Sequence, residues 1–225
     1  MRHRLAPVTR QFTDLDPARV RSNVERVRER IAAAGRDPAT VELLAAVKYV
    51  PAAELPKLAE AGIALVGENR AQELVAKHEL HGELFEWDFI GALQSRKVKE
   101  IAPIARLVHS LASESALAQL ERHPAREVLV QVNVAGEEGK TGIAPADLAA
   151  FIDACPAPVG GLMTMPPFVE RPEDNRRHFA RLAELAAEHG LKRLSMGTSQ
   201  DYEVAVQEGA TVVRLGSVLY AAGSS

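Results

Sequence analysis

The chain has 225 residues, 47% of them hydrophobic and 25% charged, which is enough for a full core and ordinary for a globular protein. Its formal net charge of −3 argues against a broad basic surface, so we expect no nucleic-acid partner. No run approaches the roughly 18 apolar residues of a membrane span, and the basic N-terminus lacks the apolar core of a signal peptide. Cys155 is the only cysteine, which fits a reducing compartment, so we expect a cytoplasmic protein without membrane contact.

The first predicted element is a helix over about residues 16–34. Asp16 can cap it, Pro17 suits its first turn, and Gly35 lies just past its end. One apolar stripe at helical spacing is formed by Val20, Val24, Val27 and Ile31. The charges between these residues are mixed in sign, which indicates a solvated face.

Strand and helix patterns then alternate to the end of the chain. Strands are predicted at residues 41–48, 63–66, 87–90, 106–110, 127–134, 160–163, 193–196 and 211–215. Between these strands, helices are predicted at about residues 53–61, 146–154, 174–189 and 201–207. Three more are predicted: one after Asn69 that ends at about residue 80, one after Gln94 that ends near residue 103, and one that Ser113 could cap.

About eight strand–helix alternations in so short a chain predict the α/β class, as a single (β/α)8 TIM-type barrel. We expect one domain over residues 1–225, with the helix at about 16–34 as an addition to the barrel. The near-continuous apolar character of the strands fits a parallel sheet that is covered on both faces. An open, doubly wound sheet is the alternative.

Lys48 ends the first apolar strand, and Pro51 follows three residues later. A buried ammonium is costly unless it is paired or neutralised, so a lysine at the end of a buried strand is unusual. At the carboxyl end of a barrel strand, such a lysine can lose its proton and attack a carbonyl. A lysine that reaches from the strand end into solvent is the alternative interpretation.

Two loops near the C-terminus indicate an anion site. Barrels often hold phosphate groups in the loops after strands seven and eight. The first of these loops contains Ser195, Gly197 and Thr198, and the second contains Gly216 and Ser217. Glycine lets backbone N–H groups approach an anion closely, and hydroxyl groups supply further donors.

Arg214 lies two residues before Gly216, so both face the same side of the final strand. Its guanidinium could bind a phosphate or a ring nitrogen, or it could form half of a structural ion pair. Closure of the barrel makes the first and last strands neighbours. A phosphorylated aldehyde could then be held by the loops at one end and bonded to Lys48 as an imine at the other. Pyridoxal 5'-phosphate (PLP) has that shape.

Other candidate residues carry weaker signals. Possible metal ligands gather at a polar helix end, namely His78, Glu79, His81 and Glu83. Their spacing matches no catalytic zinc pattern, so we predict no metal site. We interpret His109 as a core or strand-end residue and Lys140 as a solvated loop lysine. Serine nucleophile chemistry is not supported, because no Gly-x-Ser-x-Gly motif surrounds the candidate serines.

The chain resembles a known family from about Val20 to Tyr220, and the resemblance rests on seven segments in the same order. They are residues 43–48 with Pro51, 67–73, 87–97, 132–143, 161–163, 194–201 and 213–217. These segments resemble the pyridoxal phosphate homeostasis proteins, also called proline synthetase co-transcribed homologues. Seven matches in order are far more specific than any one of them.

The resemblance implies a barrel similar to the N-terminal domain of alanine racemase, with PLP as its cofactor. Lys48 would carry PLP as a Schiff base, Arg214 would lie beside the pyridine nitrogen, and Asn69 would lie near the ring. The phosphate would be surrounded by Ser195, Gly197, Thr198, Gly216 and Ser217. The family acts in intracellular PLP (vitamin B6) and amino-acid homeostasis and has no established reaction. We therefore expect PLP and PLP-dependent client enzymes as partners, and no catalytic residues.

The chain departs from the family pattern at four positions. Asp88 and Ala92 stand where the family often has histidines, Arg96 stands where asparagine is usual, and Ser217 stands where threonine is usual. The serine keeps a hydroxyl group. The absence of these two histidines bears on any function that depends on this part of the barrel rim, and not on cofactor binding itself.

Binding without turnover is the function that we expect. Because arginine stays protonated, Arg214 can donate to the pyridine nitrogen only while that nitrogen keeps its lone pair, which makes the ring a poorer electron sink. The racemases that the chain resembles take their second acid/base residue from an additional domain. Few residues follow the eighth strand to build such a domain, so we expect a monomer. Two alternatives are a PLP-dependent racemase or lyase, and a cofactor-free barrel aldolase whose Lys48 attacks a sugar phosphate.

Overall fold

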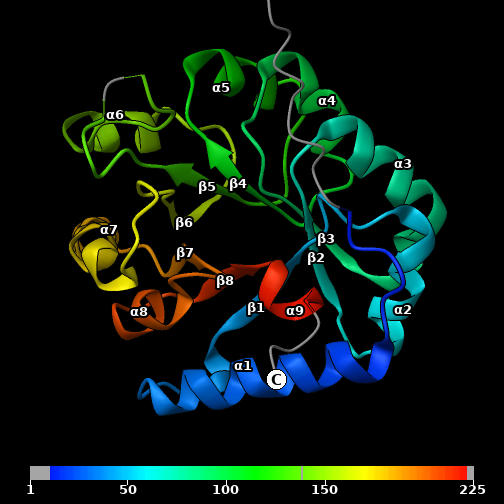
Figure 1. The fold of residues 1–225 in the computed structure, drawn as a ribbon. Coiled ribbons are helices and arrows are strands. Elements are labelled where there is room, and N and C mark those ends of the chain that lie inside the picture. Colours follow the sequence, from blue (N-terminus) through cyan, green and yellow to red (C-terminus); the bar gives the residue numbers. More distant parts are fainter. Residues whose placement is uncertain (1–10, 138, 222–225) are drawn as a thin grey trace, which may run out of the picture.

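The computed structural model describes residues 11–137 and 139–221, and within them eight parallel strands close into a barrel (Figure 1). The strands are β1 (Glu42–Ala46), β2 (Leu65–Glu68), β3 (Glu86–Phe89), β4 (Leu107–Leu111), β5 (Val128–Gln131), β6 (Val159–Met163), β7 (Arg193–Thr198) and β8 (Val212–Leu215). β1 pairs with both β2 and β8, which closes the barrel. The predicted (β/α)8 barrel is confirmed, and the open sheet is wrong.

Helices surround the barrel (Figure 1). Those between strands carry the chain from one strand to the next, and further helices precede β1 and follow β8. They are α1 (Pro17–Ala33), α2 (Leu55–Glu60), α3 (Ala71–His81), α4 (Val98–Ile101), α5 (Glu114–Leu120), α6 (Leu148–Asp153), α7 (Arg176–Glu188), α8 (Tyr202–Gln207) and α9 (Ser217–Tyr220). Short 3₁₀ helices lie at Pro38–Thr40, Ala52–Glu54, Gly82–Leu84, Ser95–Lys97, Pro145–Asp147 and Pro172–Asn175.

Several predicted elements are shorter in the structure than in the sequence analysis, among them the strand predicted at 41–48, which ends at Ala46. The strand predicted at 127–134 ends at Gln131, because the chain beyond it bends back and Val132 makes an isolated bridge with Ile143. The helix predicted to end near residue 103 is the single turn α4, preceded by a 3₁₀ turn. Element ends are set by such local hydrogen bonds, which apolar periodicity does not report.

The helix predicted at about 16–34 is α1, and its bounds are Pro17–Ala33. The carboxylate of Asp16 accepts a backbone N–H of the first turn at 3.0 Å, which caps the helix. Asn23 is buried in the middle of α1 and donates from Nδ2 to the carbonyl of Leu219 in α9 at 2.9 Å. α1 is therefore fastened to the segment that follows the last strand, beside which it lies in Figure 1.

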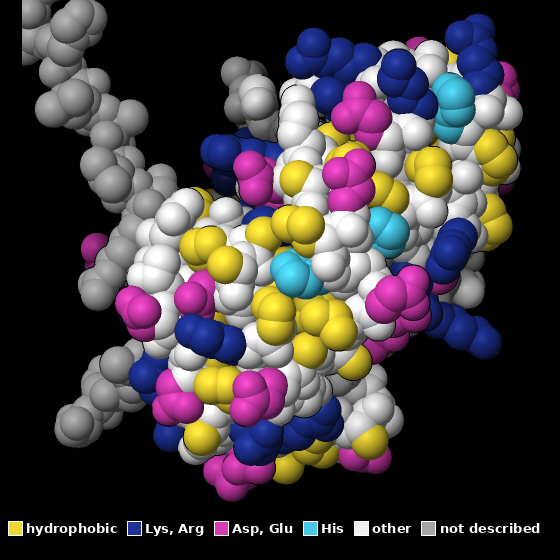
Figure 2. Space-filling model, turned by 90° about the vertical axis from the view of Figure 1, so that its right-hand side faces the viewer, with side chains coloured by type: hydrophobic (Ala, Val, Ile, Leu, Met, Phe, Trp, Pro, Cys, Tyr) yellow, Lys and Arg dark blue, Asp and Glu magenta, His cyan; other side chains and the backbone are white. Residues whose placement is uncertain are grey.

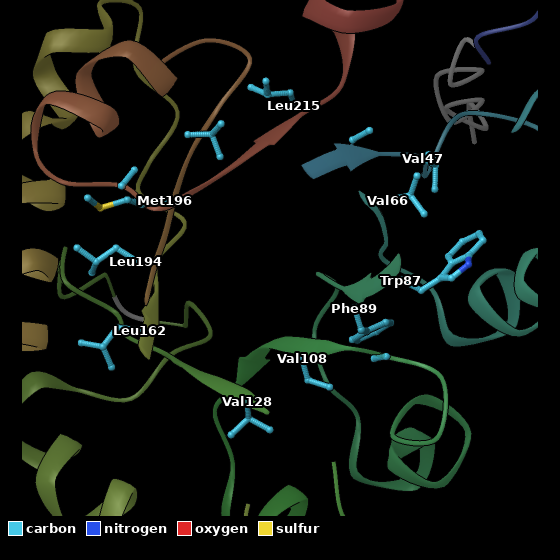
Figure 3. Close-up of a cluster of buried hydrophobic side chains, with 14 of the residues drawn as sticks. Val47, Val66, Trp87, Phe89, Val108, Val128, Leu162, Leu194, Met196 and Leu215 are labelled. Atoms are coloured by element: carbon cyan, nitrogen blue, oxygen red, sulfur yellow. The ribbon is translucent and has the colours of Figure 1, made fainter. Parts of the chain in front are cut away.

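The wall of the barrel separates two layers of buried side chains. Figure 3 shows the outer layer, in which side chains point from the strands toward the helices, among them Trp87, Phe89, Val108, Val128, Leu162, Leu194 and Met196. Residues that alternate with these face the interior, where Leu107, Leu129 and Met163 form a small apolar cluster. Buried polar side chains share that interior, and they come from β3, β4, β7 and β8: Asp88, His109, Ser195 and Arg214.

Positive and negative side chains are interspersed on the face shown in Figure 2, with small groups of hydrophobic side chains between them. This face therefore presents no continuous surface of one sign. Within the described residues, no helix combines the length and apolar character that crossing a bilayer requires. The described part of the chain also contains no group of three or more metal-ligating side chains.

Candidate functional site

Lys48 lies at the carboxyl end of the barrel, in a turn two residues beyond β1. The strand ends before the lysine because the N–H of Val50 donates to the carbonyl of Val47 at 3.0 Å and turns the chain. The Lys48 side chain is exposed, and its ammonium lies 4.8 Å from the centre of the Tyr49 ring, within cation–π range. A molecule that enters the barrel mouth can therefore reach this amine.

A buried ion pair between Glu68 of β2 and Lys77 of α3 supports the Lys48 turn. Lys77 Nζ lies 2.6 Å from Glu68 Oε2, and both side chains are almost fully buried. Lys77 also donates to the carbonyl of Val47 at 2.8 Å, and Glu68 Oε1 accepts the N–H of Asn69 at 2.7 Å. The pair thus fixes the backbone beside two predicted site residues. Sequence analysis missed it, because a strand end and the next helix have no fixed spacing.

Asn69 follows β2 and is half-buried. Gly91 packs so closely against it that a Cβ at Gly91 would overlap the carbonyl oxygen of Asn69. The hydroxyl of Ser110 in β4 donates to the carbonyl of Gly91. The ends of β2, β3 and β4 therefore hold one another at the barrel mouth, which restricts where the Asn69 side chain can lie.

Arg214 of β8 is a buried cation that makes no ion pair with the described residues. Its Nη1 donates to the carbonyl and the hydroxyl of Ser195 at 2.7 and 2.6 Å. Its Nη2 donates to the carbonyl of Thr164 and to Sδ of Met165, both at 2.9 Å. Burial lowers the pKa of Arg214 to about 10, so the group stays protonated at neutral pH. Within the described residues, the structural ion pair that the sequence left open is not formed, and these bonds leave the Nε hydrogen for a further acceptor.

The loop after β7 is tied to the loop after β8. Ser199 Oγ accepts the N–H of Gly216 at 3.0 Å. Asp201 Oδ1 accepts both the N–H and the hydroxyl of Thr198, at 2.7 and 3.0 Å. Sequence analysis missed Asp201, although Thr and Asp three residues apart at a helix start form the capping pattern that would have identified it. The two loops therefore form one connected rim.

Two glycines in these loops have different reasons to be glycine. Gly197 has a φ of +89°, and a Cβ there would lie 2.6 Å from Cβ of Ala205, so a side chain is excluded. A Cβ at Gly216 would meet nothing closer than 3.9 Å, so the chain leaves open space there. Ser217, which follows, is exposed. The second loop thus offers room and an accessible hydroxyl at the mouth.

Strand pairing brings the predicted residues to one end of the barrel. β1 pairs with β8 so that Ala45 lies opposite Leu215, which sets the Lys48 turn beside the β8 loop. β7 pairs with β8 so that Thr198 lies opposite Arg214. β2 follows on the other side of β1, with Asn69 just beyond its end. The structure therefore gathers a lysine, a buried arginine and two donor-rich loops.

A cavity of about 510 Å³ opens beside the β7 loop. One wall is the connection between β6 and α7, where Met165 and Phe168 are 50% and 78% exposed. The other wall includes Thr198 and Asp201. This volume lies in the range of small-molecule pockets. The space adjoins the same rim that Arg214 reaches through Met165.

Ser195 faces the barrel interior rather than the loop surface. It is fully buried, and its hydroxyl lies 2.8 Å from His109 Nδ1 as well as 2.6 Å from Arg214. His109 Nε2 lies 3.0 Å from Asp88 Oδ2. Asp88 therefore lies inside the barrel and not at its rim, whereas Ala92 is exposed. Sequence analysis did not connect these residues, which are 21 and 86 positions apart.

The other side of Asp88 is paired with a cluster of charges toward the opposite end of the strands. Arg106 donates to both carboxylate oxygens of Asp88, at 2.9 and 2.8 Å, and also to Glu42. Glu42 in turn accepts a hydrogen bond from Arg193, which also pairs with Glu127. The polar interior thus runs from the mouth of the barrel to its base.

Residues 15–223 match the family model described as "alanine racemase, N-terminal domain". A pyridoxal phosphate homeostasis protein of Pseudomonas aeruginosa is 44% identical over 210 residues, which cover 88% of this chain and 91% of the relative. The protein of that name from Aquifex aeolicus is 38% identical and covers 88% of this chain and 93% of the relative.

Among solved structures, PipY of Synechococcus elongatus PCC7942 with PLP bound superposes with a TM-score of 0.76 at 29% identity. The match covers 90% of this chain and 100% of PipY. The fold and the rim of the site define a barrel of the alanine racemase N-terminal type. Within that class, the chain belongs to the family of pyridoxal phosphate homeostasis proteins.

Proposed function

We propose that this chain binds PLP at the mouth of its barrel, with Lys48 as the point of attachment, and acts in intracellular PLP and amino-acid homeostasis. The observation that carries the proposal is the closure of β1 against β8, which sets an accessible lysine beside two donor-rich loops and a buried arginine that forms no ion pair with the described residues. PLP offers an aldehyde, a ring nitrogen and a phosphate to these three features. The proposal is supported by the relatives named as pyridoxal phosphate homeostasis proteins and by the structure of PipY with PLP bound.

The residues of the rim fit the phosphate end of PLP. Thr198 and Ser217 supply hydroxyl groups, and Gly197 and Gly216 let the backbone approach an anion. The open space at Gly216 leaves room for the phosphate between β8 and the Lys48 turn. Ser195, predicted among these residues, would act one step away, because its hydroxyl already contacts Arg214.

The ring of PLP would lie between Arg214 and Asn69. The Nε hydrogen of Arg214 is the guanidinium donor for which the described residues supply no acceptor, and a pyridine nitrogen with its lone pair is a matching acceptor. Asn69, held by Glu68 and Gly91, would contact the ring from the β2 side. When bound, PLP would supply an aldehyde that could condense with the amine of Lys48, with loss of water.

The same arrangement favours binding over turnover. Arg214 stays protonated at neutral pH and can only donate, so it cannot stabilise a protonated ring nitrogen as a carboxylate would. The ring is then a poor electron sink for bond cleavage at an amino-acid carbon. A protein that holds PLP and exchanges it with free amines agrees better with this chemistry than a racemase or lyase.

The proposal extends to the organisation of the protein. We place PLP binding in one domain that comprises the barrel and α1, which Asn23 fastens to α9. We further propose a cytoplasmic monomer that passes PLP to PLP-dependent client enzymes. Neither nucleic acid nor a membrane surface is expected as a partner, because the net charge is −3 and positive and negative side chains are interspersed on the face shown in Figure 2.

Borohydride trapping tests the proposal. The purified protein is incubated with PLP, reduced, digested and mapped by mass spectrometry. The added mass is expected on Lys48, and Lys48→Ala should lose it and remain folded, because the loops after β7 and β8 are tied by Ser199 and Asp201. Lys140→Ala is the control, because this exposed loop lysine pairs with nearby Glu137.

The outcomes separate the alternatives. A native protein that binds no PLP, or labelling on another lysine, would overturn the proposal. Rapid exchange of the α-hydrogen of amino acids in deuterated water would favour a racemase or lyase. Trapping of a sugar phosphate on Lys48 without PLP would favour an aldolase.

A further inference from the structure

A chain of hydrogen bonds inside the barrel connects the buried carboxylate of Asp88 to Arg214. Asp88 Oδ2 lies 3.0 Å from His109 Nε2, and His109 Nδ1 lies 2.8 Å from Ser195 Oγ. Ser195 Oγ lies 2.6 Å from Arg214 Nη1. The first three side chains are fully buried, and Arg214 is 6% exposed. Because the four residues come from β3, β4, β7 and β8, only the closed barrel brings them into line.

The direction of each hydrogen bond in this line follows from Asp88. Burial alone would raise the pKa of Asp88, but hydrogen bonds from His109 and Arg106 lower it below its usual value, so the group is a carboxylate and only accepts. His109 Nε2 must therefore carry hydrogen. Burial lowers the pKa of His109, which leaves the ring neutral and Nδ1 with a lone pair.

The tautomer of His109 affects Arg214 through the hydroxyl group of Ser195. A lone pair on His109 Nδ1 accepts the hydroxyl hydrogen of Ser195. The oxygen of that hydroxyl is then free to accept from Arg214 Nη1. With the opposite His109 tautomer, Nδ1 would donate to the same oxygen, and the Ser195 hydroxyl hydrogen would lose the acceptor that fixes its direction. The carboxylate of Asp88 therefore determines how Arg214 is held.

Arg214 depends on such support because no carboxylate of the described residues pairs with it. Its Nη groups contact a hydroxyl, two carbonyls and a thioether, all of them neutral. A buried guanidinium with neutral acceptors is stabilised by a chain of hydrogen bonds that leads to a negative charge. Asp201 acts on it only through space and not by contact.

We propose that Asp88 is a positioning residue for PLP, which acts through His109 and Ser195 to hold Arg214 so that its Nε hydrogen stays available to the pyridine nitrogen. This inference rests on the proposed function. It assigns a role to a residue that touches neither the mouth of the barrel nor the rim loops. The competing explanation is structural, because Asp88 also pairs with Arg106 at 2.8 Å in the charged cluster at the base.

The first test needs neither PLP nor a variant. Isotope-labelled histidine in the PLP-free native protein reports the protonation of each ring nitrogen by NMR. His109 should be neutral at neutral pH, with hydrogen on Nε2 and none on Nδ1. An imidazolium, or hydrogen on Nδ1, would overturn the proposal whatever the protein binds.

The second test compares Asp88→Asn with Glu42→Gln. An amide can donate or accept, so in Asp88→Asn both tautomers of His109 become possible, and the PLP dissociation constant should rise about 10-fold. Glu42→Gln removes another partner of Arg106 without touching His109, and it should leave both the tautomer and PLP affinity unchanged. Affinity is measured by absorbance titration, and folding by circular dichroism.

Every outcome decides the matter. Equal losses of PLP affinity in the two variants, or native affinity in Asp88→Asn, would show that Asp88 is merely structural. If Asp88→Asn does not fold, His109→Gln is measured in its place and should show the same 10-fold loss of affinity. A native protein that shows the expected tautomer and binds no PLP would instead refute the proposed function.

Discussion

The ammonium of Lys77 donates to the carbonyl of Val47, the residue immediately before Lys48, at 2.8 Å. The same ammonium pairs with Glu68, whose other oxygen accepts the N–H of Asn69. One buried ion pair therefore positions the backbone just before the proposed attachment point and the backbone of Asn69 at the end of β2. Its contribution to the free energy of unfolding can be compared with that of a partly exposed ion pair.

Lys77→Met should destabilise the protein by about 3–5 kcal/mol, because the uncharged side chain leaves the Glu68 carboxylate buried without its positive partner. Urea unfolding monitored by circular dichroism measures the loss. Lys57→Met is the matched control: its pair with Glu54 is partly exposed, and its removal should cost less than about 1 kcal/mol. Equal losses in the two variants would contradict the structural role assigned to the Lys77 pair.

Gly197→Ala should destabilise the protein by about 3 kcal/mol, because the positive φ and the contact with Ala205 both oppose a Cβ. Movement of this loop should also weaken PLP binding. Gly190→Ala is the control, since Gly190 has a φ of +65° but no atom near the added Cβ. It should lose only about 1–2 kcal/mol and keep native PLP affinity. An unchanged affinity in Gly197→Ala would argue against a PLP site at this loop.

Stability should fall on the acid side of neutral pH. Burial lowers the pKa of His109 below its usual 6.5, so as the pH falls below that value the unfolded chain takes up a proton before the folded one does. Asp88, whose folded pKa lies below its usual 3.8, adds a further loss at still lower pH. Both contributions are fully present above about pH 6.5 and are lost as the pH falls.

Urea unfolding from about pH 5 to about pH 8 checks this dependence. The free energy of unfolding should rise with pH up to about 6.5, and His109→Gln should flatten that rise. A native protein that is more stable at about pH 5 than at neutral pH would show that His109 is not held neutral in the barrel.

The alternation of strands and helices, and with it the barrel, could be predicted from the sequence because apolar periodicity and glycine or proline boundaries are local properties. Lys48, Arg214 and the loops containing Gly197 and Gly216 could also be located, because barrels place their sites at the carboxyl ends of strands. The end of β1 before Lys48 could not, since it depends on the hydrogen bond between Val50 and Val47.

Side chains that meet across the barrel were decided by the tertiary structure alone. The sequence indicated no partner for Asp88, His109 or Ser195, because they lie on strands that face one another only after β1 has paired with β8. The pair of Glu68 and Lys77 likewise forms only where α3 packs over the end of β2. Local patterns determined which elements form, whereas burial in a closed interior determined which polar groups had to find one another, since an unpaired charge there is too costly to keep.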